Sequence, residues 1–280
     1  MNTTHRDMIR PTLLQRSQMA AVEFVANPLR PFWFRGKGRL LNGICPRIGS
    51  RKNTLFGYNV EFDLLDHIQR NVYLGTYEPH ESKLVRSYLS PGITFVDVGA
   101  NFGYYSLMAA SAVGPSGHVF SFEPNPEICD HLRGTIRENK IANITVEQAG
   151  VSDEAGWSEL FLPIQRGNNT ATMVPNAGGH PVRVPVVTLD EYLDRSHITR
   201  VDFLKIDVDG FEPRIIRGAQ AAIRAKRIKA VLCEFCGEWL RAVGTTPRAH
   251  YDQLRSLGLR SVTEPTEATL ENGNILFVPE

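Results

Sequence analysis

The sequence has few cysteines, no long hydrophobic run and almost no net charge. Its 280 residues include four cysteines, too few for the disulfide framework of a small secreted domain. No uninterrupted apolar run approaches the roughly 18 residues that a membrane-spanning helix needs. The apolar stretch Met19–Ala26 is short and contains Glu23, so we expect no secretory signal and a cytoplasmic location. A net charge of +1 excludes a global field that would attract nucleic acid.

Positive charge is concentrated at the start of the chain. Residues 1–52 contain ten Lys or Arg residues and two acidic residues. Such asymmetry indicates contact with an anionic partner, such as a membrane surface, or an arm whose arginines are simply solvated. We favour the second interpretation. We predict a basic arm or cap at residues 1–70 and the main domain at residues 71–280; nothing in the sequence indicates an oligomeric state.

A strand, a glycine turn and a helix follow one another within Thr94–Leu107. The run Ile93–Val98 is apolar and β-prone, and Tyr104–Val113 is typical of a helix. Between them, Gly99 and Gly103 permit positive φ angles and a close approach of the backbone to a ligand. We expect free N–H groups at the start of this helix, where a carboxylate or phosphate could bind. A purely structural turn is the alternative.

The turn differs from the Gly-x-Gly-x-x-Gly pattern of dinucleotide-binding proteins. Asn101 stands where the middle glycine would be, in space that a pyrophosphate would use. The carboxylate of Asp97 repels phosphate but accepts hydrogen bonds from an ammonium group. The turn therefore favours S-adenosylmethionine over NAD, and a nicotinamide-dependent oxidoreductase is kept as an alternative.

An acidic residue ends the next predicted strand, Gly117–Phe122. Glu123 lies 24 positions after Gly99, the spacing at which a carboxylate can accept both ribose hydroxyls of an adenosine. Pro124 restricts the turn that leads into a predicted helix at Pro126–Lys140. Capping of that helix is the alternative role for Glu123.

A third strand is predicted at Ile144–Val151. It leads to Ser152 and Asp153, which could accept a hydrogen bond from the exocyclic amine of adenine. Asp153 could equally cap the turn that follows. Further extended segments, which we interpret as a β-ribbon and a wall of the substrate site, are predicted at Trp157–Pro163, Ala171–Val174 and Val182–Val187.

Two later strands carry polar residues that a buried strand would not need. In Val201–Val208, strand alternation puts Lys205 and Asp207 on one side. The strand Ala230–Phe235 places Glu234 near its end. Because ligands bind at the carboxyl ends of strands in open α/β sheets, we predict a functional site here.

The acidic residues at these strand ends could do chemistry on a hydroxyl group. A base must remove the hydroxyl proton, and the candidates are Asp207, Glu212 and Glu234. Several carboxylates together could also hold Mg²⁺, although nothing beyond the acidic residues supports a metal. Alternatively, Glu212 and Glu234 form structural ion pairs with Lys205 and Arg214.

The succession of motifs resembles the FkbM-type methyltransferases over about residues 72–279. The resemblance implies an α/β fold, the Rossmann-like class I methyltransferase sheet of seven mostly parallel strands with an antiparallel last strand and helices on both faces. It also implies transfer of a methyl group from S-adenosylmethionine to a hydroxyl of a sugar, glycolipid or polyketide-like metabolite. Asp209 and Gly150 depart from the family pattern. The motifs are Phe95–Leu107, Phe120–Pro126, Ala149–Asp153, Leu189–Leu193, Phe203–Glu212, Gly218-Ala219 and Cys233–Phe235.

The predicted site residues follow from both lines of reasoning. The catalytic candidates are Asp207, Glu212 and Glu234, and no residue is assigned to a metal. Glu78, before the central strand, is a further cofactor candidate and could equally be a helix cap. We expect a small-molecule or glycan acceptor, with an RNA methyltransferase using the basic arm as the alternative. The predicted cofactor-binding residues are Glu78, Asp97, Gly99, Ala100, Asn101, Gly103, Glu123, Pro124, Ser152, Asp153 and Asp207.

Overall fold

The computed structural model describes residues 36–45, 47, 49–163, 171–174 and 179–280, together with Ser17, Val22 and Phe24. Residues 1–35 of the predicted basic arm, apart from Ser17, Val22 and Phe24, lie outside these residues, so its contact with a membrane stays a prediction. The chain divides into two compact units, Met1–His80 with Gln165–Asn169 and Glu81–Ile164 with Thr170–Glu280. The predicted boundary after residue 70 also stays a prediction. Among the helices of the described part, none is long and apolar enough to cross a membrane.

The first unit contains a β-hairpin and short helices. Phe56 and Gly57 both have positive φ angles, as the two-residue turns of hairpins require. Buried Arg70 donates to the carbonyl oxygens of Leu64 and Leu65 and so ties the helix that carries it to the end of the hairpin. The elements are α2 (Lys37–Ile44), β1 (Ser50–Leu55), β2 (Tyr58–Asp63) and α3 (His67–Tyr73).

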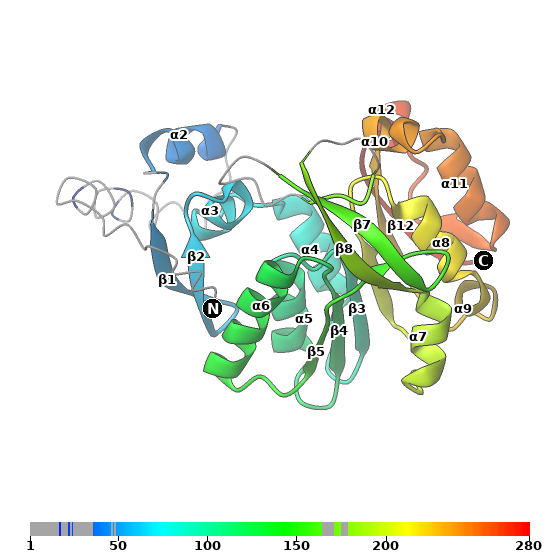
Figure 1. Ribbon diagram of the computed structural model, residues 1–280, viewed down its shortest axis with the longest axis horizontal. Coiled ribbons are helices and arrows are strands. Elements are labelled where there is room, and N and C mark those ends of the chain that lie inside the picture. Colours follow the sequence, from blue (N-terminus) through cyan, green and yellow to red (C-terminus); the bar gives the residue numbers. More distant parts are fainter. Residues whose placement is uncertain are drawn as a thin grey trace. The chain divides into compact units, whose positions relative to one another are not determined.

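The second unit is built on a seven-stranded sheet (Figure 1) with the strand order β11-β12-β10-β9-β3-β4-β5. β10, β9, β3, β4 and β5 are parallel to one another, and the last strand, β12, is antiparallel to both of its neighbours. The predicted mostly parallel sheet with an antiparallel last strand is therefore confirmed. The strands are β3 (Thr94–Val98), β4 (His118–Phe122), β5 (Ile144–Glu147), β9 (Phe203–Ile206), β10 (Val231–Cys236), β11 (Leu259–Ser261) and β12 (Asn272–Pro279).

Helices connect these strands, and several begin at sequence signals that are easy to recognise. Asn125 accepts from the Glu127 N–H at 3.1 Å, and Thr246 accepts from the Ala249 N–H at 3.1 Å, each just before a proline at the first helical position. The helices are α4 (Pro79–Tyr88), α5 (Tyr104–Val113), α6 (Pro126–Asn139), α7 (Leu189–Arg195), α8 (Glu212–Gly218), α9 (Gln220–Arg224), α10 (Gly237–Ala242), α11 (Pro247–Ser256) and α12 (Glu267–Glu271).

Strand alternation separates the two faces of the sheet. Phe95 and Phe203 stack with ring centroids 5.5 Å apart, and Tyr88 of α4 packs on Phe203. Their neighbours Val96 and Leu204 point the other way, into a buried cluster that includes residues of α7, α8 and α11. Helices therefore cover both faces, as predicted. Positions 95, 97, 203, 205 and 207 share the α4 side of the sheet.

The predicted third strand is wrong in its length. Only Ile144–Glu147 joins the main sheet, and Gly150–Val151 forms β6 of a separate sheet with the order β6-β8-β7. Gly150 pairs with Val186 of β8 in this second sheet and packs so closely there that a Cβ atom would lie 2.9 Å from the Met173 sulfur. The ribbon strands β7 (Gly156–Leu162) and β8 (His180–Val187) confirm two of the predicted extended segments.

Gly99 lets the end of β3 come unusually close to β9. Its φ is +84°, and a Cβ atom there would lie 1.9 Å from the backbone oxygen of Asp207. The Asp207 N–H in turn donates to the Val98 oxygen at 3.1 Å. This glycine is thus required by the packing of two strand ends.

Gly99→Ala tests this close approach against a matched glycine. Gly114 also has positive φ, +65°, but nothing lies within 4 Å of its missing Cβ. Both substitutions strain the backbone, and only Gly99→Ala forces two strands apart. Urea unfolding should show that Gly99→Ala lowers the free energy of unfolding by about 1–3 kcal/mol more than Gly114→Ala. Equal losses would mean that the strand ends separate at no cost.

Candidate functional site

The backbone N–H groups of the glycine turn between β3 and α5 donate hydrogen bonds within the protein. Each backbone N–H from residue 99 to residue 103 donates to an acceptor inside the protein at 2.7–3.0 Å. The turn itself therefore has no free N–H group at residues 99–103, and the expectation of free N–H groups in the first turn of α5, from Tyr104 onward, stays a prediction. The acceptors are the Phe122 carbonyl for Gly99 and Ala100, the Glu123 carboxylate for Asn101, the Asn101 side chain for Phe102 and the Ala100 carbonyl for Gly103.

Asp97 lies buried beneath this turn. Its Oδ2 accepts from the Ser106 hydroxyl at 2.6 Å, and Ser106 also meets the Ser121 hydroxyl at 2.7 Å. The network anchors the first turns of α5 to β3 and β4. The second carboxylate oxygen of Asp97, Oδ1, is buried without a hydrogen-bond partner. Burial raises the pKa of Asp97, although Lys205 opposes this rise.

Glu123 is held at the end of β4 by two backbone amides. Its Oε2 accepts from the Asn101 N–H at 2.9 Å and its Oε1 from the Asn125 N–H at 2.8 Å. Each oxygen keeps a second acceptor position. Burial raises the pKa of Glu123 to about 7, against the lowering effect of these hydrogen bonds. Pro124, which follows, has no N–H to compete for the carboxylate.

Gly103 serves helix packing. A Cβ atom at Gly103 would lie 2.3 Å from Leu132 Cδ1, so this glycine allows α5 to begin against α6. Together with Asp97, Gly99, Ala100, Asn101 and Glu123, it forms one continuous cluster at the carboxyl ends of β3 and β4.

Ser152 and Asp153 lie in different surroundings. The Asp153 carboxylate forms an ion pair with Arg217 of α8 at 2.9 Å and accepts from the Ser152 hydroxyl at 3.0 Å. A Cβ atom at Gly218 would lie 2.0 Å from the Ser152 backbone oxygen. The pair therefore packs beside the last turn of α8, and its predicted contact with adenine stays a prediction.

Sequence reasoning missed Gln148, which directly follows β5. The register pairs Glu147 with Phe122, so Gln148 lies at the same edge of the sheet as Glu123. Its side-chain oxygen accepts from Arg133 at 3.2 Å. The available signal was its place as the first residue after the strand.

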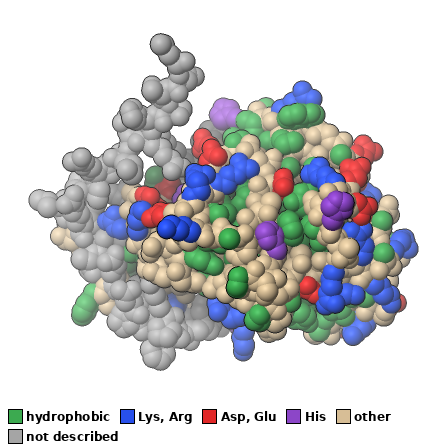
Figure 2. Space-filling model, turned by 90° about the horizontal axis from the view of Figure 1, so that it is seen from below, with side chains coloured by type: hydrophobic (Ala, Val, Ile, Leu, Met, Phe, Trp, Pro, Cys, Tyr) green, Lys and Arg blue, Asp and Glu red, His purple; other side chains and the backbone are tan. Residues whose placement is uncertain are grey.

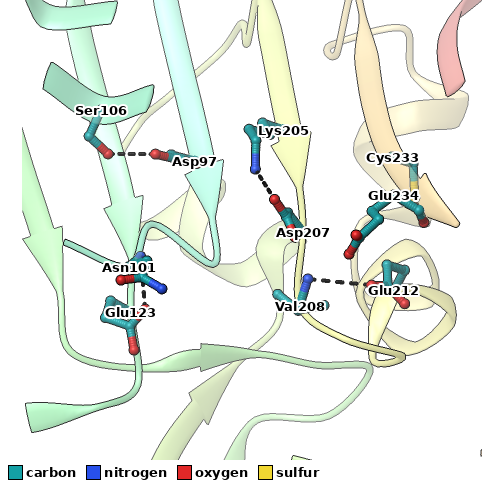
Figure 3. Close-up of polar contacts among 10 residues, drawn as sticks. All are labelled: Asp97, Asn101, Ser106, Glu123, Lys205, Asp207, Val208, Glu212, Cys233 and Glu234. Carbon is teal, nitrogen blue, oxygen red and sulfur yellow. Dashed lines mark hydrogen bonds and ion pairs between the residues drawn. The ribbon is translucent and has the colours of Figure 1, made fainter. Parts of the chain in front are cut away.

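Lys205 and Asp207 form a close ion pair at the end of β9 (Figure 3). Lys205 Nζ lies 2.6 Å from Asp207 Oδ2 and 4.5 Å from the ring centroid of Tyr105. The Lys205 side chain is 4% exposed, whereas that of Asp207 is 28% exposed. Asp207 is thus the member of the pair that a ligand can reach. The predicted placement of both residues on one side of the strand is confirmed.

Glu212 is fully buried at the start of α8. Its Oε1 accepts from the N–H groups of Val208 and Gly210 at 3.3 and 3.2 Å, and its Oε2 has no hydrogen-bond partner. Burial raises the pKa of Glu212 to about 7. The carboxylate fixes the loop after β9, in which Asp209 has a φ of +51°. These two hydrogen bonds fix the loop, and the alternative ion pair of Glu212 with Arg214 does not.

Two predictions stay untested by this geometry. Glu78 belongs to the first unit, and its role as a cofactor ligand stays a prediction. Within the described ranges, no group of three or more His, Cys, Asp or Glu side chains is arranged to hold a metal ion. The suggestion of Mg²⁺ at the acidic strand ends thus gains no support.

Comparison with known proteins places this cluster in a family. Residues 97–261 match the methyltransferase FkbM domain, a stretch that includes the glycine turn, Glu123, Lys205, Asp207 and Glu234.

Two curated relatives match parts of the chain. The chain is 30% identical over 175 residues to 31-O-demethyl-FK506 methyltransferase FkbM of Streptomyces tacrolimicus, which covers 52% of this chain and 66% of that protein. It is 25% identical over 130 residues to hexuronic acid methyltransferase AglP of Haloferax volcanii, covering 46% of this chain and 51% of that protein. The chain thus spans between about half and two thirds of the length of these relatives.

The chain is also similar to a solved structure, methyltransferase FkbM from Methylobacillus flagellatus KT, with 15% sequence identity and a TM-score of 0.45. The match covers 94% of this chain and 60% of the solved one. Because the FkbM domain matches well over half of the 280 residues, the chain belongs to the FkbM family of S-adenosylmethionine-dependent methyltransferases.

Proposed function

We propose that this chain transfers the methyl group of S-adenosylmethionine to a hydroxyl group of a small-molecule or glycan acceptor. The observation that carries the choice of cofactor is the hydrogen-bonding state of the glycine turn. Its N–H groups from residue 99 to residue 103 already donate within the protein, so the site offers acceptors and few donors. An ammonium group and a ribose diol bring donors, and they complement such a site.

The residues present fit this cofactor. The buried, unpartnered Oδ1 of Asp97 is an acceptor directly beneath the turn, where an ammonium group would relieve its cost of burial. Glu123 has two oxygens fixed by backbone amides, and each can accept one more hydrogen bond from a ribose hydroxyl. S-adenosylmethionine, when bound, supplies an electrophilic methyl group.

A nicotinamide-dependent oxidoreductase fits less well. A pyrophosphate at a helix N-terminus is bound by free backbone N–H groups, and the turn at residues 99–103 has none to give. The carboxylates of Asp97 and Glu123 would repel its negative charge.

An RNA methyltransferase is also less well supported. Figure 2 shows, on the face it presents, Lys and Arg side chains interspersed with Asp, Glu and uncharged groups among the residues that are coloured. On this face, the coloured residues do not concentrate positive charge along one stripe, as binding to a nucleic acid backbone requires. The basic residues among 1–35, on which the RNA alternative depends, lie outside the described part of the chain.

The names of two relatives support an oxygen acceptor. The name of one specifies an O-demethyl form of FK506, so its methyl group is added to an oxygen. The name of the other specifies a hexuronic acid, which carries hydroxyl and carboxyl oxygens. Because this chain covers 66% and 51% of those proteins, its own acceptor is a proposal at the level of chemical class.

The partial exposure of Asp207 beside Lys205 supports a role for Asp207 as the base. An alcohol is a poor nucleophile until its proton leaves. The Asp207 carboxylate is partly exposed at the carboxyl end of β9, and its Oδ2 is held by Lys205. As the new O–CH₃ bond forms, the acceptor's hydroxyl proton passes to the Asp207 carboxylate and from there to solvent. The buried groups around it exclude water and fix its orientation.

The ionisation of Glu123 should control cofactor affinity. Its pKa of about 7 means that the carboxylate gains its charge as the pH rises through neutrality, and the charged form accepts more strongly from ribose hydroxyls. Calorimetric titration should therefore show tighter binding of S-adenosylmethionine at pH 8 than at pH 6. Glu123→Gln should weaken binding by about 10- to 100-fold at pH 8 and flatten this dependence.

Glu127→Gln is the matched control, because Glu127 is an exposed carboxylate of the same turn. It should bind like the wild type. NAD should not bind to any of these proteins. Binding of NAD by the wild type, or an unchanged affinity in Glu123→Gln, would contradict the proposed cofactor site.

Product analysis tests the acceptor class. The enzyme is incubated with S-adenosylmethionine carrying an isotopically labelled methyl group and with three acceptors: a hydroxyl-rich macrolide, a uronic-acid oligosaccharide and an RNA oligomer. We expect label in an ether linkage of the macrolide or the sugar. Labelling of the RNA alone, together with binding that weakens steeply with salt, would overturn the proposal in favour of nucleic acid.

A further inference from the structure

Asp207 and Glu234 stand side by side on neighbouring strands. The parallel register pairs Ile206 of β9 with Cys233 of β10, so the next residue of each strand follows at the same level. Figure 3 shows the Glu234 carboxyl group directed toward Asp207. Both side chains lie on the sheet face that carries Lys205, because Leu232 pairs with Lys205 and strand alternation repeats every second residue.

Of the two carboxyl groups, that of Asp207 forms an ion pair with a buried cation. Lys205 Nζ contacts Asp207 Oδ2 at 2.6 Å and is held in place by the ring of Tyr105. Glu234, in contrast, has its Oε2 buried without a hydrogen-bond partner. Two adjacent carboxylates in a partly dry site cannot both carry charge, and the cation decides which of them does. The arrangement thus favours a charged Asp207 and a neutral Glu234.

The surrounding charges also favour a charged Asp207 and a neutral Glu234. The negative charge of Asp207 and burial together raise the pKa of Glu234 to about 11. Burial alone would raise the pKa of Asp207, but Lys205 and the hydrogen bonds from Glu234 and Lys205 bring it below its ordinary value. The titratable groups that face this pair are Lys205 and Tyr105, Asp97 on β3, Asp209 and Glu212 after β9, and Cys233 on β10.

We propose that Glu234 is a positioning residue that stays protonated and donates a hydrogen bond to Asp207, leaving Asp207 as the sole base. The inference rests on the proposed function for the identity of the base, but the protonation of Glu234 does not. Glu234 is thereby removed from the predicted set of bases and given the opposite role. During turnover the proton of Glu234 stays where it is, and the acceptor's proton passes only to Asp207 and then to solvent.

Infrared spectroscopy of the protein without cofactor or acceptor tests the protonation directly. At about pH 9, above the pKa values near 7 of Glu123 and Glu212, we expect the carboxylic-acid C=O stretch of Glu234 to persist. The difference between wild type and Glu234→Gln should contain this band. The difference between wild type and Glu238→Gln should not, since Glu238 is an exposed carboxylate on α10.

Absence of the acid band from the Glu234→Gln difference spectrum would overturn the proposal, whatever reaction the protein catalyses. Because this readout needs no turnover, its failure is distinct from a failure of the proposed methyl transfer. Circular dichroism of each variant confirms that the fold is retained.

Kinetics then separates the two roles. Glu234→Gln keeps a hydrogen-bond donor toward Asp207, so its kcat should stay within about tenfold of the wild type, whereas Asp207→Asn should lower kcat by about 10²- to 10⁴-fold. Glu234→Leu removes the donor and should move the acidic limb of the kcat/KM profile to higher pH, because the charge on Asp207 loses a stabilising partner. A purely structural Glu234 would leave that limb in place.

Two kinetic results would count against the proposal. If Glu234→Gln were as inactive as Asp207→Asn, Glu234 would act as an ionised base. If Asp207→Asn kept full turnover, the base would lie elsewhere. If the acidic limb of the kcat/KM profile lies at lower pH in Glu234→Gln than in Glu234→Leu, as in the wild type, the result supports the role of Glu234 as a hydrogen-bond donor.

Discussion

The buried ammonium group of Lys205 is the charge on which the acidic edge of the sheet depends. It lies on the central strand β9 and contacts Asp207 at 2.6 Å and the face of Tyr105 at 4.5 Å. Burial raises the pKa values of Asp97 and Asp209, and the Lys205 charge opposes both rises. Removing a charge from water is costly unless the charge is paired. Lys205 therefore keeps the carboxylate of Asp207 charged at an edge of the sheet where burial favours the neutral form of several other acidic groups.

The glycine turn and the end of β9 that carries Asp207 are joined by close packing. Gly99 allows the turn to approach the backbone of Asp207, and the Asp207 N–H donates back to Val98. The cofactor cluster and the candidate base are therefore parts of one rigid junction between β3 and β9. A displacement of the turn would move the Asp207 backbone with it, which is how alignment of donor and acceptor can be built into the sheet.

The sequence was sufficient for the fold and for most of the acidic edge. Strand alternation and the position of Lys205 and Asp207 before a glycine indicated a site at the carboxyl end of that strand. The hydrogen-bonding state of the turn was not predictable. Whether an N–H group is free depends on Glu123 and the Phe122 carbonyl, which come from the next strand. The division of the predicted third strand between two sheets was likewise not predictable, because it depends on the pairing of Gly150–Val151 with β8, which is distant in sequence.

Unsatisfied polar atoms gather where the chemistry is proposed. Among the residues that the structure describes, Asp97, Glu212 and Glu234 each have a buried side-chain oxygen that lacks a hydrogen-bond partner. Such atoms are rare in folded proteins because each costs free energy. At the proposed cofactor site, binding of a donor-bearing ligand would relieve the cost at Asp97. At Glu234 it is limited by the proton, since a neutral carboxyl group is far less costly to bury than a charged one. The unpartnered atoms thus lower the stability of this edge of the sheet, while Asp207 keeps its charge and its orientation in a partly dry site.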